Sequence, residues 1–202
     1  MAELKLTYFD FSASRGEECR LALHAAGADF HDERIKREAW AELKETTPFG
    51  ALPILEIEGK PALAETNAIL TYIGHRFGML PTDPWEAARH EALLSAGESL
   101  RSAMGPLRKA KDEDEKKKTR AEFIDGYLKR WATNVDAQIK GPFVGGAELS
   151  VADIKLYVSA HALCSGVFDY FPADVLSPYK KLSALYKAVG EHAKIAEWRA
   201  KA

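Results

Sequence analysis

The chain has 202 residues, of which 47% are hydrophobic and 29% are charged, and its formal net charge is −2. These values are ordinary for a folded globular protein and allow one or two domains. The near-neutral charge excludes the strongly basic composition that is typical of nucleic-acid-binding domains, so we expect no nucleic-acid partner.

Membrane, secretion and metal signals are all weak. No apolar run reaches the ~18 residues that a membrane-spanning helix needs, and we expect no membrane partner. The first residues lead directly into a β-rich segment without a secretory signal pattern, which predicts a cytoplasmic protein. Cys19 and Cys164 are far apart and form no C-x-x-C pair, which argues against a disulfide framework. The histidines never recur at helical spacing, so no metal site is predicted.

The first elements alternate between strand and helix. Residues 4–9 are rich in β-forming residues and predict a strand, and residues 29–35 predict a second one. Between them, Ser14 and Glu17 match a capping box, which predicts a helix that begins at Ser14 and ends near Gly27. The two strands flank a crossover helix and are therefore expected to be parallel. A short helical piece follows at residues 37–45.

Residues 47–78 contain the most informative stretch, TPFGALPILEIEGKPALAETNAILTYIGHRFG. Two short β-rich runs at 53–57 and 60–64 are separated by a turn signal, and they predict a pair of strands. Apolar residues then recur at helical spacing over 67–77, with Glu65 or Thr66 as the expected cap.

Beyond residue 84 the strand signals disappear. Residues 79–84 (MLPTDP) contain two prolines and predict a linker. Pro106 is expected to kink the first long helix of the second half, and Ser150 with Asp153 predicts a capping box at the start of a later one. The expected helices are 87–110, 119–139, 151–165, 179–191 and 193–200.

The order P-F-G-x-L-P-I-L-E followed by E-[ST]-N-A-I-L-x-Y-I resembles the glutathione-binding half of cytosolic glutathione S-transferases, the sigma class above all. The S-V-A-D-I element resembles the start of that family's buried sixth helix, so the resemblance runs from Lys5 to Trp198. It implies a thioredoxin-like α/β domain at 1–78, a linker at 79–84 and an all-helical domain at 85–202. It also implies glutathione as co-substrate, a hydrophobic electrophile as second substrate, and a homodimer.

The same resemblance assigns a catalytic role to Tyr8, whose hydroxyl would stabilise the glutathione thiolate. The family pattern Y-F … R-[GA]-E-x-x-R places Arg15 beside it. Here the loop between Tyr8 and Arg15 is one residue longer than in the sigma pattern, which leaves Ser12 and Ser14 as alternative hydroxyl donors.

The remaining site residues follow from matched positions, and each matched group would contact one part of the substrates. Trp40 and Lys44 are expected at the glycine carboxylate, Leu52 and a cis Pro53 at the peptide backbone, and Glu65 and Thr66 at the γ-glutamyl group. Glu98 and Ser99 are expected to act across the dimer. The residues expected at the electrophile are Phe11, Met104, Leu107 and Arg108.

The sequence therefore predicts a glutathione transferase that conjugates the glutathione thiolate to hydrophobic electrophiles. Two alternatives stay open. The same site would serve a glutathione-dependent isomerase or peroxidase. A transferase-like protein without catalysis would keep the fold as a binding or structural module.

Overall fold

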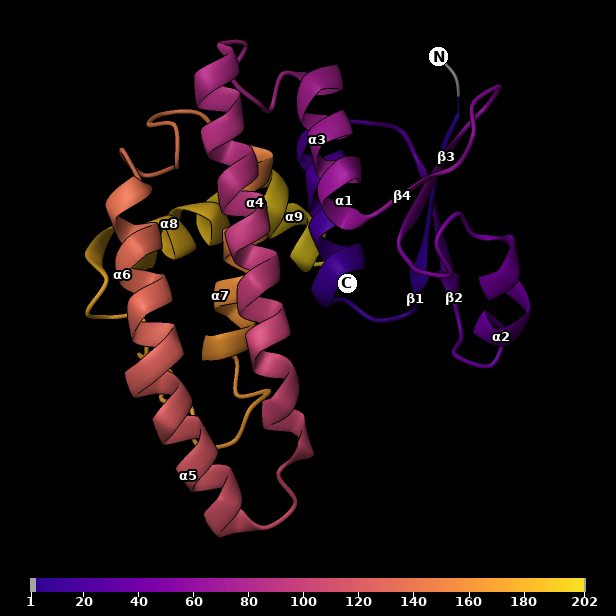
Figure 1. The fold of residues 1–202 in the computed structure, drawn as a ribbon. Coiled ribbons are helices and arrows are strands. Elements are labelled where there is room, and N and C mark those ends of the chain that lie inside the picture. The colour runs from indigo at the N-terminus through magenta and orange to yellow at the C-terminus, as the bar shows by residue number, and fades with distance from the viewer. Residues whose placement is uncertain (1–2, 202) are drawn as a thin grey trace. The chain divides into compact units, whose positions relative to one another are not determined.

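The structure is a computed structural model that describes residues 3–201. The chain forms two compact units, residues 3–82 with 191–201, and residues 83–190. Figure 1 labels their elements. The first unit has an α/β thioredoxin-like arrangement and the second is helical, as predicted.

The elements of the first unit alternate as the sequence predicts. They are β1 (Leu4–Phe9), α1 (Ser14–Ala25), β2 (His31–Ile35), α2 (Trp40–Leu43), the 3-10 turn η1 (Lys44–Thr46), β3 (Ile54–Ile57), β4 (Leu63–Ala64), α3 (Thr66–Phe77) and, from the end of the chain, α9 (Ala193–Arg199).

The four strands form one sheet in the order β2-β1-β3-β4. The predicted parallel pairing of β1 and β2 is confirmed, and β3 runs antiparallel to both β1 and β4. This topology brings the end of β1, the start of β3 and the end of β4 to the same end of the sheet. Tyr8 lies at this end, and we call it the Tyr8 edge. The helices α1 and α3 each follow a strand at that edge, so both N-termini lie there.

Helices α1 and α3 lie side by side against the sheet (Figure 1), and α9 packs on α1. The core between them consists of side chains with almost no exposed surface, such as Leu6, Leu55, Leu21 and Ile69. Because α9 packs on α1, the last residues group with the first unit, whereas the sequence analysis grouped them with the helical domain.

In the first unit one predicted helix cap is wrong, and the other lies at a predicted residue but lacks the side-chain bond. The N-cap of α1 is Ala13, and Ser14 is already in the left-handed region at φ 65°, so it lacks the extended backbone that a side-chain cap requires. In α3 the N-cap is Glu65 at φ 70°, and no side-chain cap bond is formed. Both helices therefore begin with unusual backbone geometry at the same edge of the sheet.

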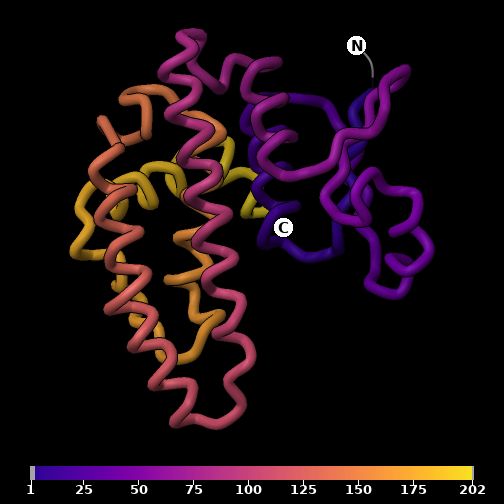
Figure 2. The backbone as a smooth tube through the Cα atoms, viewed as in Figure 1, coloured from indigo at the N-terminus to yellow at the C-terminus, as the bar shows by residue number. Residues whose placement is uncertain are grey.

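The second unit contains α4 (Pro84–Met104), η2 (Gly105–Lys109), α5 (Glu113–Phe123), the π-helical turn η3 (Ile124–Leu128), α6 (Lys129–Gln138), α7 (Val151–Cys164) and α8 (Lys180–Glu191). Helix α4 packs against α7 and α6. Figure 2 shows α4 and α6 running in opposite directions.

Long helices of this unit differ in detail from the expected ones. Pro106 does not kink one continuous helix. Instead, α4 ends at Met104, and the proline lies in the 3-10 turn that follows. The expected helix 119–139 begins earlier, at Glu113, where Asp112 caps it. A π-helical turn then separates α5 from α6.

The capping box of α7 is confirmed. The Ser150 hydroxyl accepts from the Asp153 N–H, and the fully buried Asp153 carboxylate accepts from the N–H and hydroxyl of Ser150. It also accepts from the Val144 N–H at 2.6 Å. Burial raises the pKa of this carboxyl. The element therefore ties the preceding loop to the helix and has a structural explanation.

Candidate functional site

Several candidate residues of the first unit lie where β1 ends, β3 begins and β4 ends. Tyr8 is the penultimate residue of β1, Leu52 lies just before β3, and Glu65 follows β4. Helix N-termini carry free N–H groups and a partial positive charge, which favour anionic ligands. Two such termini, those of α1 and α3, meet at this edge.

The Tyr8 ring is closely packed, and its hydroxyl donates no hydrogen bond to another described residue. The side chain is 5% exposed, and a Cβ on Gly16 would lie only 2.0 Å from its Cδ1 atom, so the backbone of α1 touches the ring. Its ring contacts Phe9 and Phe11 edge-on, each at 5.5 Å between centroids. Within the described residues the phenolic O–H donates to no protein acceptor, and it is available to a ligand.

Aromatic contacts connect Tyr8 to α2. The rings of Phe9 and Phe11 stack at 6.3 Å, and Phe9 meets Trp40 edge-on at 5.9 Å. The indole N–H of Trp40 makes no hydrogen bond in the part of the chain that the structure describes. The exposed Lys44 lies one turn further along, with its stem beside Gly50.

The segment before β3 has the geometry that the resemblance implies. The Leu52–Pro53 peptide bond is cis, as predicted, and Pro53 is buried. Leu52 is half-buried and lies outside the pairing of β1 with β3, which reaches only Ile54. Its backbone groups are therefore not used by the sheet.

The start of α3 presents an unsatisfied buried hydroxyl. Thr66 is 3% exposed, and its Oγ1 atom has no hydrogen-bond partner among the described residues. Glu65 beside it is exposed, with a strained φ of 70°, and its carboxylate pairs with no described cation. A buried hydroxyl without a partner is uncommon, and at a helix N-terminus it suits a bound carboxylate.

Arg20 is a residue that the sequence analysis left without a role. It is fully buried and donates to Asp32 at 2.8 Å and to the carbonyl oxygens of Phe11 and Phe9 at 3.0 and 3.1 Å. The signal available in the sequence was a charged residue on the apolar face of the first helix. Arg15, matched by the family pattern, is partly buried in the first turn of α1.

The predicted residues of the second unit lie in α4 and η2. The Glu98 carboxylate forms an ion pair with the fully buried Lys155, whose ammonium nitrogen lies at 3.0 Å. The Nε atom of Arg101 lies 3.9 Å from the same carboxylate. The Ser99 hydroxyl donates to the Ser95 carbonyl. Of the expected wall for the second substrate, Met104 and Leu107 are buried, Phe11 is 38% exposed, and Arg108 lies over the Phe168 ring at 5.7 Å.

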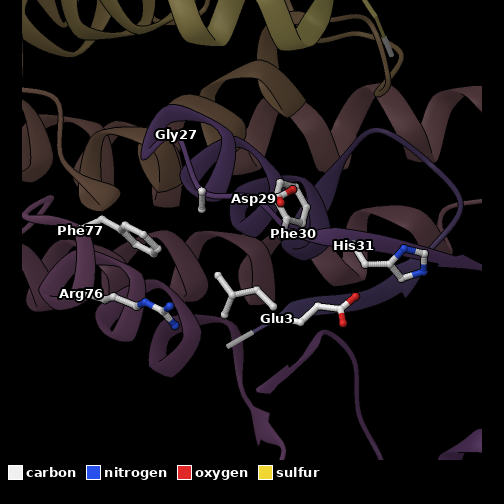
Figure 3. A pocket seen from close by; sticks show the side chains of 9 residues that line it. Glu3, Gly27, Asp29, Phe30, His31, Arg76 and Phe77 are labelled. Atoms are coloured by element: carbon white, nitrogen blue, oxygen red, sulfur yellow. The ribbon is translucent and has the colours of Figure 1, made fainter. Parts of the chain in front are cut away.

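A separate pocket of about 550 Å³ lies at the opposite edge of the same sheet (Figure 3). It is lined where β1 and β2 begin and where α1 and α3 end, by residues that include Asp29, Phe30, Arg76 and Phe77. Helix C-termini carry partial negative charge, and this edge also carries carboxylates. It therefore suits the two carboxylates of glutathione less well than the edge at Tyr8.

The described residues contain neither a metal-binding cluster nor a membrane-spanning helix. Among residues 3–201, no cluster of three or more His, Cys, Asp or Glu side chains is arranged to hold a metal ion. No helix in the same range combines the length and apolarity required to cross a bilayer.

Family models match both halves of the chain. The glutathione S-transferase N-terminal domain matches residues 4–75, and the glutathione S-transferase C-terminal domain matches residues 99–202. The first of these is the glutathione-binding domain of a family that uses glutathione as co-substrate.

Individual relatives agree with these matches. Glutathione S-transferase 1 of Ascaris suum is 42% identical over 106 residues, and this match spans 52% of the chain and only about half (50%) of the relative. The crystal structure of the glutathione S-transferase from Ascaris lumbricoides is 31% identical, with a TM-score of 0.81 over 98% of this chain and 97% of that one. Prostaglandin synthase D of Nilaparvata lugens is 28% identical, with a TM-score of 0.83 over 98% of each chain. The chain therefore belongs to the glutathione S-transferase family.

Proposed function

We propose that this protein is a cytoplasmic glutathione transferase that binds glutathione at the Tyr8 edge and conjugates its thiolate to hydrophobic electrophiles, as in detoxification. The observation that carries the proposal is the rigid Tyr8, whose O–H donates to no described residue, at an edge where two helix N-termini meet. Family membership supports the choice of glutathione as the ligand.

Each end of glutathione finds a complementary group. The indole N–H of Trp40 and the ammonium of Lys44 are donors for the glycine carboxylate. The free backbone groups of Leu52 pair with the peptide as an added strand would. At the γ-glutamyl end, the carboxylate binds at Thr66 and the α3 N-terminus, and Glu65 accepts from the ammonium.

The chemical task at Tyr8 is to stabilise the thiolate. A free thiol has a pKa near 8.5, so only a few per cent is ionised at neutral pH. Lowering that pKa by about two units requires about 2.7 kcal/mol of preferential interaction with the anion. One hydrogen bond from a neutral hydroxyl to a charged sulfur supplies an energy of that order. Arg15, in the first turn of α1, adds a positive charge near the same edge.

The second substrate is an electrophile with an apolar body. Phe11, beside Tyr8 and 38% exposed, supplies an apolar surface for it in the first unit. We assign Met104, Leu107 and Arg108 to the same binding surface, as the family resemblance implies.

A glutathione-dependent isomerase is the second candidate, because one similar structure is named a prostaglandin synthase D. Such a reaction uses the same thiolate but returns free glutathione at the end of each cycle. Product analysis separates the two: a transferase consumes glutathione stoichiometrically, whereas an isomerase does not.

We also propose a homodimer, in which one copy's Phe49 enters a groove of the other. Phe49 is 69% exposed, which leaves most of its ring available to a partner. A groove of about 360 Å³ on α4 and α6 is lined by Leu93, Ala96, Trp131 and Val135, with Ser99 at its side. A two-fold dimer would use this contact twice and would place Glu98 and Ser99 near the partner's glutathione. The Phe49→Ser variant is expected to sediment as a monomer.

The test of the function is Tyr8→Phe, which removes only the hydroxyl. Turnover with an aryl halide should fall tenfold or more, since each 1.4 kcal/mol lost from the transition state costs about a factor of ten. The pKa of the bound thiol should rise, and retention on immobilised glutathione should persist. If Ser12→Ala or Ser14→Ala raises the pKa of the bound thiol and Tyr8→Phe does not, a serine is the donor. If no variant changes it and no conjugate forms, the non-catalytic alternative is correct.

A further inference from the structure

Arg20 makes the most complete set of polar contacts near Tyr8. The guanidinium lies on α1 with no exposed surface, and it divides its N–H groups between three acceptors. One is the Asp32 carboxylate on β2, and the other two are the carbonyl oxygens of Phe9 and Phe11. These carbonyls belong to the turn that directly follows Tyr8 in the chain.

The turn itself has few other supports. The Phe11 N–H bonds back to the Phe9 carbonyl at 2.9 Å, and the Asp10 N–H bonds to the Ile35 carbonyl at 3.0 Å. The Arg20 guanidinium of α1 therefore binds two carbonyl groups of the turn, and β2 binds the turn through the Ile35 carbonyl. Backbone freedom at Phe9–Phe11 would change the direction of the Tyr8 side chain and of Phe11.

Arg20 also lies over the ring of Tyr8. Its Cζ atom is 5.8 Å from the ring centroid, within the range of a cation–π contact. One turn earlier on the same helix, the backbone at Gly16 touches the ring. Two residues of α1 thus restrain one ring.

We propose that Arg20 is a positioning residue for Tyr8: it holds the turn after β1 and the ring itself, so that the hydroxyl points at the glutathione sulfur. This inference rests on the proposed role of Tyr8. Asp32 fixes the plane of the guanidinium. Arg34 shares that carboxylate at 2.7 Å and contacts the turn only through the Asp10 side chain, at 3.5 Å, so it holds no backbone carbonyl of the turn. Lysine cannot replace Arg20, because a single ammonium cannot reproduce three diverging hydrogen bonds.

The experiment is a double-mutant cycle with Tyr8→Phe, Arg20→Lys and the combined variant, and Arg34→Lys as the matched control. Three quantities are measured in each: turnover with an aryl halide, the pKa of the bound thiol from thiolate absorbance, and the midpoint of unfolding in urea. Residues that act as one unit give non-additive losses.

We expect Arg20→Lys to lower turnover about tenfold and to raise the bound-thiol pKa, with little further loss when Tyr8→Phe is already present. Arg34→Lys should leave both quantities unchanged. Additive losses, or an unchanged thiol pKa in Arg20→Lys beside a raised one in Tyr8→Phe, would overturn the inference. An unchanged thiol pKa in Tyr8→Phe overturns the proposed role of Tyr8, and this inference with it.

A second variant covers the case in which Arg20→Lys does not fold. Asp32→Asn keeps Arg20 and weakens its orientation, so it should move the thiol pKa in the same direction by a smaller amount. A folded Asp32→Asn protein whose thiol pKa matches the wild type contradicts the positioning role.

Discussion

The indole N–H of Trp198 donates to the Glu17 carboxylate at 2.9 Å and joins two residues that are 181 positions apart in the chain. Trp198 lies on α9 and Glu17 on α1, and the indole also stacks on Phe30 at 6.1 Å. Glu17 is 6% exposed and lies 3.7 Å from Arg20. The last helix is therefore connected through one buried carboxylate to the residue that holds the Tyr8 turn.

Trp198→Phe should destabilise the protein by about 1–3 kcal/mol, because it leaves a buried carboxylate oxygen without its donor. Urea unfolding measures the change. Trp85→Phe is the matched control, since Trp85 is 74% exposed and a surface substitution stays within about 0.5 kcal/mol. Equal effects from the two variants would mean that the Glu17 bond contributes nothing measurable.

Glu17 should also make stability depend on pH. Burial is the largest cause that raises the pKa of this carboxyl from its usual 4.5, although Trp198 and Arg20 oppose it. A raised folded-state pKa means that the folded protein binds the proton more tightly. The contribution of Glu17 to the free energy of unfolding is therefore complete below about pH 4.5 and is lost as the pH rises through the folded-state pKa.

Glu17→Gln keeps an oxygen that accepts from Trp198 and removes the ionisation. Its free energy of unfolding, relative to wild type, should increase as the pH rises from 4.5, and urea titrations across that range measure it. Glu197→Gln supplies a control of opposite sign, because ion pairing with Lys201 lowers the pKa of that exposed carboxyl. Parallel pH profiles for wild type and Glu17→Gln would contradict the assignment.

The Glu98–Lys155 pair should respond asymmetrically to substitution. Lys155 is fully buried, and its stem packs where a Cβ on Gly97 would lie 2.8 Å from it. Removing the carboxylate leaves a buried ammonium without that partner, which costs up to about 3–5 kcal/mol. Lys155→Met keeps the packing and leaves a carboxylate that water can reach, so Glu98→Gln should be the more destabilising change.

The same two variants test the proposed role of Glu98 across the proposed dimer. Glu98→Gln should raise the KM for glutathione, whereas Lys155→Met, which retains the carboxylate, should leave it near the wild-type value. An unchanged KM in Glu98→Gln would remove Glu98 from the binding site and leave it a structural counterion.

Asp153 should be the most costly cap in the chain to remove. Its carboxylate accepts from three buried donors, so Asp153→Ala should cost at least about 2 kcal/mol, while Ser150→Ala should cost about 0.5–2 kcal/mol. Asp112→Ala, at the exposed cap of α5, is the control and should fall at the low end. Thermal and urea unfolding provide the values. Loss of glutathione affinity in a folded Asp153 variant would show that the element is more than structural.

Local pattern determined a large part of this protein. Strand β1 lies at Leu4–Phe9 as predicted, and α7 begins with the predicted Ser150–Asp153 box, because β-propensity and capping depend on residues that are close in sequence. The cis bond before Pro53 and the family itself were likewise identified from a contiguous stretch. These features need no knowledge of distant residues.

Tertiary structure alone decided the rest. Ser14 is not the expected cap, because its backbone lies at φ 65°, and α9 joins the first unit through Trp198. Arg20 meets Asp32 and the Tyr8 turn only after β1 and β2 have paired. Such contacts depend on the directions of side chains brought together by the whole sheet, and neither periodicity nor propensity carries that information.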